Sequence, residues 1–220
     1  AIVDSGATPV IVDIEKNYYT LDPNLIEDKI TKKTKAVIPV HIYGQCCEMK
    51  KITKIAKKWN IYLIEDCSQA HGAKIYNKSV GTFGIMSTFS FYPTKNLGAI
   101  GDGGIIVTRK KSIAEKIKKF REYGWNKNRS SKNPGINSRL DEMQAAILNT
   151  KLKIFKKTKN VRIKIAKEYL KKIKNKNITL PEIRKNSTHV FHIFSILIKN
   201  RKNFLRYLNY HKVYPGIHYP

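Results

Sequence analysis

One stretch of the sequence, residues 87–104, restricts the possible folds more than any other. It reads STFSFYPTKNLGAIGDGG. Residues 87–92 are aromatic and rich in β-formers, which indicates a short strand. The proline that follows cannot stand inside a central strand, so the next residues form a turn, and residues 105–108 return as a second strand. The pattern therefore predicts that Lys95 lies at a constrained corner between two buried strands.

Lysine is an unusual choice for packing at such a corner and a natural one for covalent chemistry. A neutral lysine nitrogen attacks a carbonyl carbon to give a Schiff base. Residues 61–64 form a short apolar run that ends in Glu65 and Asp66 and indicates a buried parallel strand. Ligands of open α/β sheets bind at the carboxyl ends of the strands, where Asp66 would face the ligand and Glu65 the opposite side.

Pyridoxal phosphate would use both Lys95 and Asp66, because it needs a lysine for its aldehyde and an acid beside its pyridine nitrogen. Each residue also has a simpler explanation. A loop lysine is usually a solvated charge, and an aspartate at a strand end often caps the next helix. The two residues alone leave these alternatives open.

Four ordered motifs are similar to those of the DegT-type, pyridoxal-phosphate-dependent sugar aminotransferases. They read PVHIYGQCCEM, IEDCSQAHGA, GTFGIMSTFSFYPTKNLGAIGDGG and GINSRLDEMQAAIL, beginning at residues 39, 64, 81 and 135. The resemblance runs over nearly the whole chain and implies an α/β fold like that of type I pyridoxal-phosphate transferases. It also implies a homodimeric enzyme that transfers an amino group, usually from glutamate, to a keto-sugar of a nucleoside diphosphate sugar. Polysaccharide or related amino-sugar biosynthesis would use the product.

The resemblance assigns cofactor-binding roles to five residues. Lys95 would form the Schiff base and carry protons, and Asp66 would pair with the pyridine nitrogen. Gln69 would contact the ring or its 3-hydroxyl group, and Ser90 would bind the cofactor phosphate. Asn137 would reach the phosphate in the other subunit of a dimer.

Two further residues match positions near the sugar nucleotide, Tyr43 and His218, although His218 could equally be an ordinary polar loop residue. His189 and His192 are interpreted as strand residues. Relatives that remove a sugar hydroxyl carry histidine in place of the lysine at position 95, so the lysine favours transamination over dehydration. The motif HIYGQ is more similar to that of relatives that aminate C3 of the sugar than to that of relatives that aminate C4.

The composition leaves room for other classes of protein. The net charge of +27 is typical of nucleic-acid binding, but the 35 lysines and 8 arginines are spread along the chain, which favours a solvated surface. A non-catalytic, cofactor-binding regulator is a second alternative. The three cysteines lack a metal-ligand spacing and are odd in number, which favours reduced thiols in the cytoplasm, and no apolar run approaches the roughly 18 residues of a membrane span. We therefore expect no metal, nucleic-acid or membrane partner.

Hydrophobic periodicity predicts alternating strands and helices, and hence a mostly parallel sheet flanked by helices. We divide the chain into a large cofactor-binding α/β domain, 1–154, and a smaller C-terminal α/β domain, 155–220. The resembled family has an upstream Gly-Thr segment for the cofactor phosphate, which this sequence lacks, and continues beyond GIHYP. The resemblance therefore implies that both domains are incomplete and that the chain is an internal fragment or a truncated product. The expected strands are 8–13, 36–40, 61–64, 87–92, 105–108 and 189–198; the expected helices are 24–31, 48–59, 112–123, 140–152, 161–173 and 203–211, with a long loop at 124–137.

Overall fold

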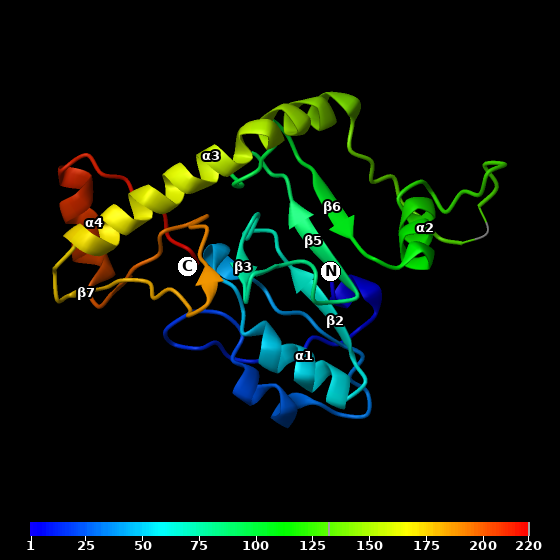
Figure 1. The fold of residues 1–220 in the computed structure, drawn as a ribbon, viewed down its shortest axis with the longest axis horizontal. Coiled ribbons are helices and arrows are strands. Elements are labelled where there is room, and N and C mark those ends of the chain that lie inside the picture. Colours follow the sequence, from blue (N-terminus) through cyan, green and yellow to red (C-terminus); the bar gives the residue numbers. More distant parts are fainter. Residues whose placement is uncertain (132, 220) are drawn as a thin grey trace.

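The centre of the fold is a four-stranded sheet with the strand order β1-β2-β5-β6 (Figure 1). We describe it from a computed structural model that covers residues 1–131 and 133–219. The neighbours β1, β2 and β5 run parallel, and β6 pairs antiparallel with β5. The predicted α/β class with a mostly parallel sheet is therefore confirmed. The strands are β1 Ala36–Val37, β2 Tyr62–Asp66, β5 Met86–Ser90 and β6 Gly104–Val107.

The register of β2 and β5 decides which side chains share a face of the sheet. Asp66 pairs with Thr88, and Glu65 pairs with Ser87. Side chains alternate along a strand, so Asp66, Thr88 and Ser90 share one face, while Glu65 and Ser87 lie on the other. The two carboxylates at the end of β2 therefore point to opposite sides, as the sequence predicts.

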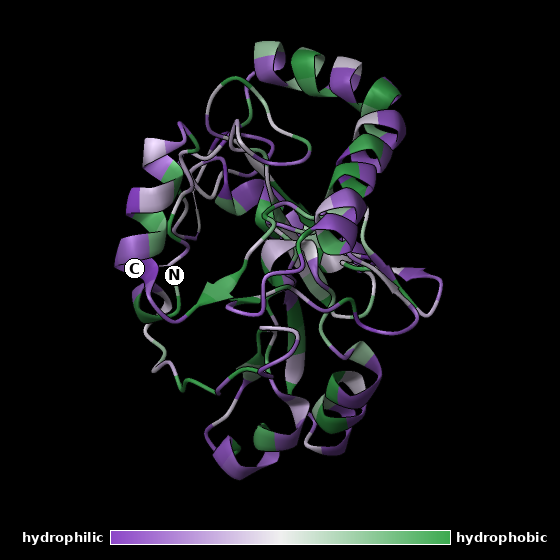
Figure 2. Ribbon diagram, turned by 90° about the vertical axis from the view of Figure 1, so that its left-hand side faces the viewer, coloured by the Kyte–Doolittle hydropathy of each residue, from purple (hydrophilic) through white to green (hydrophobic). Residues whose placement is uncertain are grey.

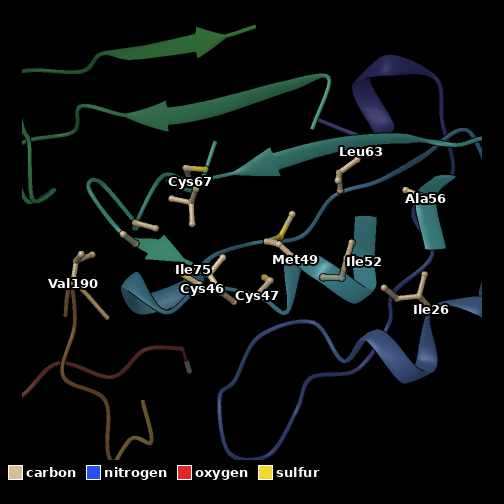
Figure 3. Close-up of a cluster of buried hydrophobic side chains, with 13 residues drawn as sticks. Ile26, Cys46, Cys47, Met49, Ile52, Ala56, Leu63, Cys67, Ile75 and Val190 are labelled. Atoms are coloured by element: carbon tan, nitrogen blue, oxygen red, sulfur yellow. The ribbon is translucent and has the colours of Figure 1, made fainter. Parts of the chain in front are cut away.

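Helix α1, Met49–Lys58, closes one side of the sheet with a regular apolar stripe. Met49, Ile52 and Ala56 are buried at helical spacing, and they pack against Leu63 of β2 (Figure 3). All three cysteines are buried in or beside this core and are free thiols, in agreement with the sequence prediction. The core therefore lies directly beneath the sheet edge that carries the predicted site.

Helix α3 is one continuous helix, Glu142–Lys172, of 31 residues, and it crosses the upper part of Figure 1 diagonally. The prediction of two helices, 140–152 and 161–173, was wrong at the connection between them, because no glycine or proline interrupts the intervening residues. The carboxylate of Asp141 caps the helix by accepting the Gln144 N–H at 2.8 Å. Phe155 lies inside α3, and the division into 1–154 and 155–220 stays a prediction.

The shorter elements complete the fold. A three-stranded sheet, β4-β3-β8, and a pair, β7 with β9, lie beside the central sheet, and the predicted loop 124–137 contains only isolated bridges among its described residues. Helices α2 and α4 begin and end within three residues of their predicted bounds. These elements are β3 Lys74–Ile75, β4 Lys78–Ser79, β7 Ile178–Thr179, β8 Ser187–Thr188, β9 Leu197–Ile198, α2 Lys111–Phe120, α4 Arg201–Tyr210, and the 3-10 turns Val3–Ser5, Pro23–Leu25, Glu27–Lys29 and Ile42–Gly44.

Three predicted elements were wrong, and so was the prediction that Lys95 lies between two buried strands. Residues 8–13 form no strand, because no described strand pairs with them, and Ile11 is 81% exposed. Residues 24–31 form two 3-10 turns, since so short a segment does not sustain an isolated helix. Most of 189–198 is irregular, and two of its residues, Val190 and Ile193, bond to residues 43–44 instead. Strand β6 is exposed, so the corner of Lys95 is not enclosed by two buried strands.

Figure 2 shows hydrophilic and hydrophobic residues interleaved along the helices. In the part of the chain that the structure describes, no helix has the length and apolar character needed to cross a membrane.

Candidate active site

The lysine turn, which we define as residues 92–99, follows β5 directly and folds back on itself. The backbone N–H of Lys95 donates to the carbonyl of Tyr92 at 2.9 Å. A Cβ atom at Gly98 would lie 2.6 Å from the carbonyl oxygen of Pro93, so only glycine fits there. The turn thus holds Lys95, which is half-buried, just beyond the carboxyl end of β5.

Helix α3 fixes the lysine turn from outside. The ammonium group of Lys151 donates to the Gly98 carbonyl at 2.6 Å. The buried side chain of Leu148 packs in a small cluster with Phe91 and Ala99. The turn is therefore attached to a rigid helix rather than left as a free loop.

Asp66 and Ser90 lie on the same face of the sheet and at the same edge as the lysine turn. Asp66 Oδ1 accepts the Ser68 N–H at 2.9 Å, and Ser90 Oγ accepts the Tyr92 N–H at 3.2 Å. Both residues are half-buried. The structure therefore brings a carboxylate, a hydroxyl group and a primary amine to one edge of the sheet, as the sequence predicts.

Tyr43, Gln69 and His218 form a second group linked by hydrogen bonds. The Tyr43 N–H donates to Gln69 Oε1 at 2.7 Å, and the Tyr43 hydroxyl donates to the carbonyl of His218 at 2.8 Å. Gln69 Nε2 donates to the Tyr219 hydroxyl at 2.8 Å. Burial raises the pKa of Tyr43, so its hydroxyl stays protonated and can donate. The amide of Gln69 is thus already bonded at both ends to segments near the predicted sugar-nucleotide residues.

The segment 190–193 joins the lysine turn to this second group. Asn96 Nδ2 donates to the Val190 carbonyl at 3.1 Å, and the Ile193 N–H donates to the Tyr43 carbonyl at 3.4 Å. His192 lies between these contacts, where burial lowers its pKa to about 4. Sequence reasoning treated His192 as a strand residue; the only signal that could have singled it out is a second histidine three residues after His189 in an apolar run.

Asn137 lies apart from the other predicted residues. It is exposed in the segment between α2 and α3, bridges to Glu122, and accepts a hydrogen bond from Arg139 Nε at 3.2 Å. Among the described residues, no hydrogen bond connects it to the lysine turn. Figure 1 shows this segment projecting beyond β6.

Behind the sheet, Glu65 is fully buried and ties three segments together. Its carboxylate accepts backbone N–H groups of Gly81, Phe83 and Gly84 at 2.6–2.8 Å. It also accepts His41 Nε2–H at 3.2 Å. Hydrogen bonds hold the pKa of Glu65 below its ordinary value although burial opposes this.

The Glu65 network includes a group of possible metal ligands, since the ligand atoms of His41, Glu65 and Cys67 lie within 4.8 Å of one another. His41 Nδ1 accepts the Cys47 N–H at 3.1 Å, which leaves the ring proton on Nε2 for Glu65. Both ring nitrogens and both carboxylate oxygens therefore already have protein partners. The cluster is accounted for by hydrogen bonding that supports the strand end carrying Asp66.

Comparison with known proteins shows the family to which the chain belongs. Residues 1–220 match the profile of the DegT/DnrJ/EryC1/StrS aminotransferase family. The chain belongs to this family. It is 48% identical over 220 residues to the dTDP-3-amino-3,6-dideoxy-alpha-D-galactopyranose transaminase of Aneurinibacillus thermoaerophilus, covering 100% of this chain and 61% of that protein.

Solved structures of similar proteins have the same fold. The structure of S. venezuelae DesV in complex with ketimine intermediate has a TM-score of 0.93 at 37% identity, covering 96% of this chain and 57% of DesV. NtdA from Bacillus subtilis with bound cofactor PMP has a TM-score of 0.89 at 32% identity, covering 100% of this chain and 51% of NtdA. The chain therefore spans less than two thirds of the length of these proteins.

The cofactor of the DegT/DnrJ/EryC1/StrS family is pyridoxal phosphate, and the residues at the sheet edge fit it. Asp66 offers a carboxylate for the pyridine nitrogen, Ser90 a hydroxyl for the phosphate, and Lys95 a primary amine for the aldehyde. Two buried polar atoms beside the lysine turn, Asn96 Oδ1 and His192 Nδ1, have no hydrogen-bond partner among the described residues. Such atoms are rare in folded proteins, and they indicate a polar ligand at this edge.

Proposed function

We propose that this protein is a pyridoxal-phosphate-dependent aminotransferase that moves an amino group from an amino acid, glutamate, to the keto-sugar of a nucleoside diphosphate sugar. One observation carries the proposal: an acid, a hydroxyl group and a lysine turn meet at the carboxyl edge of β2 and β5, in a chain of an aminotransferase family. The cofactor, when bound, supplies an electron sink for removing a proton from carbon. The remaining tasks belong to residues of the chain.

Each residue at the sheet edge has a task that follows from its chemistry. The carboxylate of Asp66 would hold a proton on the cofactor's pyridine nitrogen by charge. Ser90 Oγ would donate to the cofactor phosphate. Lys95 Nζ would bond the cofactor covalently and, once released by the amino donor, would move the proton between carbon atoms as a general base and acid.

The substrate-binding residues would be Tyr43 and His218, which hydrogen bonds link to each other and to the cofactor-binding residue Gln69 beside the lysine turn. Gln69, which accepts the Tyr43 N–H, would position Tyr43 beside the cofactor. The name of the A. thermoaerophilus relative supports a dTDP-linked sugar aminated at C3, which agrees with the HIYGQ motif. Polysaccharide or amino-sugar biosynthesis would use such a product.

Asn137 supports a homodimer. Its exposed amide on a projecting segment suits a contact with the cofactor phosphate of a second subunit. The free, buried cysteines and a nucleotide-sugar substrate support a cytoplasmic enzyme.

The test is chemical labelling of Lys95. Full-length protein loaded with pyridoxal phosphate is reduced with borohydride, digested and mapped, and L-glutamate is added to a parallel sample while the cofactor absorbance is followed. We expect a phosphopyridoxyl group on Lys95 and a change of absorbance with glutamate. A label on another lysine with Lys95 unmodified would contradict the assignment of Lys95, and an absorbance that glutamate leaves unchanged would contradict the proposed reaction.

A further inference from the structure

His189 and His192, three residues apart in one segment, differ in the hydrogen bonding of their Nδ1 atoms. His189 Nδ1 accepts the Phe191 N–H at 3.0 Å, and its ring stacks on Phe191 with centroids 4.0 Å apart. His192 is half-buried as a residue, but its Nδ1 atom is buried and has no hydrogen-bond partner in residues 1–131 and 133–219. Buried polar atoms are nearly always hydrogen-bonded, so His189 is explained by the fold and His192 is not.

The backbone on both sides of His192 fixes its position. The Val190 N–H donates to the Gly44 carbonyl at 3.0 Å, and the Val190 carbonyl accepts Asn96 Nδ2–H at 3.1 Å. A Cβ atom at Gly44 would lie 3.1 Å from the backbone nitrogen of His192 and 2.7 Å from the Val190 side chain. His192 is therefore held between the lysine turn and the turn of Tyr43, whose hydroxyl bonds the carbonyl of His218.

The electrostatic surroundings of His192 keep its ring neutral. Burial, and to a smaller extent the positive charges of Lys95 and Arg162, lower its pKa to about 4; His71 and His218 also lie close enough to contribute. A neutral imidazole does not attract a carboxylate or a phosphate by charge, but it readily forms hydrogen bonds with a hydroxyl group. Of the groups on a nucleotide sugar, the ring hydroxyls fit best.

We propose that His192 is a substrate-binding residue, whose Nδ1 hydrogen-bonds a hydroxyl group of the sugar ring beside Lys95. This inference rests on the proposed function. It adds to the substrate-binding residues Tyr43 and His218 a third residue that reaches the sugar from the side of the lysine turn.

The test compares two amide variants and one apolar variant of full-length protein loaded with pyridoxal phosphate. In His192→Asn the amide lies near the place of Nδ1, and in His192→Gln it lies near the place of Nε2; His192→Leu removes both. The matched control is His189→Asn, whose amide oxygen can still accept the Phe191 N–H. Each variant is checked for folding by circular dichroism. The probe is dTDP-3-amino-3,6-dideoxy-α-D-galactose, whose dissociation constant is measured by calorimetry, alongside the rate of the absorbance change with L-glutamate.

We expect His192→Leu and His192→Gln to bind the dTDP-sugar about 10-fold more weakly than the parent, the scale of one lost hydrogen bond. His192→Asn and His189→Asn should bind it within about 3-fold of the parent, well inside one such bond. The glutamate rate should stay within about 2-fold in all variants, since no bond to the amino donor is removed.

Three results would overturn the role of His192. In the first, His192→Leu and His192→Gln bind the dTDP-sugar as tightly as the parent does. In the second, His192→Asn and His192→Gln lose the same amount of affinity for the dTDP-sugar. In the third, the rate with glutamate falls together with the affinity for the sugar. The last would place His192 at the cofactor. A parent protein whose absorbance glutamate leaves unchanged would contradict the proposed function instead, because the sugar affinities are measured without turnover.

Discussion

Neighbouring carboxylates at the end of β2 show how one residue step changes the task of the same chemical group. Asp66 is half-buried and faces the lysine turn, whereas Glu65 is fully buried and holds four donors behind the sheet. The period of two along a strand predicts this opposition from sequence. The partners of Glu65 could not be predicted, because residues 81–84 and His41 reach it only through the tertiary fold.

The first prediction concerns Asp66→Asn in full-length protein. The change is nearly isosteric, so the protein should fold, but the charge that keeps the pyridine nitrogen protonated is lost. The glutamate-driven absorbance change should slow by several orders of magnitude, about 3–6 kcal/mol at roughly 1.36 kcal/mol per decade. Asp28→Asn, at an exposed position, is the control and should match the parent. A rate within about tenfold of the parent, or roughly one such decade, would rule out this role.

The second prediction concerns Glu65→Gln and acid. The NH₂ group of the new amide would face N–H donors. The free energy of unfolding, measured with urea at pH 7, should therefore fall by about 2–4 kcal/mol. The pKa of Glu65 is depressed by folding, so its stabilisation is complete above its ordinary value of 4.5 and is lost as pH falls through the lower folded value. Between pH 7 and pH 3 the parent should therefore lose more stability than the variant. Parallel losses in the two proteins would be inconsistent with a depressed pKa.

At the scale of elements, local patterns predicted the helices and paired strands better than the irregular segments. Residues 48–59 and 203–211 have an apolar stripe, and the structure has α1 and α4 there. Residues 189–198 are rich in β-formers, yet most of them are irregular, and Val190 and Ile193 bond to the turn at 43–44. Strand propensity cannot predict this, because it describes a half-buried surface and not which partner covers it.

The third prediction tests how α3 is seated on the Gln69–Ala73 segment. Gly72 and Gly6 both have φ of +77°, but a Cβ atom at Gly72 would lie 2.9 Å from the Phe155 ring of α3, and one at Gly6 would meet nothing within 4 Å. Gly6→Ala therefore measures only the backbone strain, about 1 kcal/mol. Gly72→Ala should destabilise the protein to urea by about 1–3 kcal/mol more, through overpacking. Equal losses of stability in the two variants would show that the Phe155 ring of α3 moves away from the new methyl group without a loss of free energy.

At the scale of the whole molecule, Arg184 connects segments that are far apart in the sequence. Its side chain is 7% exposed, forms ion pairs with Glu15 and, at 3.7 Å, with Glu48, and donates to the Cys46 carbonyl at 3.0 Å. Its guanidinium also lies 4.1 Å from the centre of the Tyr18 ring. Nothing in the local sequence singles out this arginine among eight. Its partners are brought to it only by folding.

The fourth prediction is that Arg184→Met lowers the free energy of unfolding by about 2–4 kcal/mol, since two largely buried carboxylates lose their cation. Arg206→Met, on the exposed side of α4, should change it by less than about 0.5 kcal/mol. Urea unfolding at pH 7 measures both. A small effect of Arg184→Met would mean that Glu15 and Glu48 find water in the folded protein.

The contact between Asn96 and Val190 has a consequence for the order of events during synthesis. These residues are 94 positions apart, and chains emerge from the ribosome N-terminus first at about 5–20 residues per second. The sheet and the lysine turn therefore leave the ribosome several seconds before the segment that holds the turn in place. During that interval Lys95 lies in a turn that residues 190–193 do not yet hold in place. The lysine turn therefore gains this contact only after residue 190 has been synthesised, and a ribosome that stalls before residue 190 leaves the turn without it.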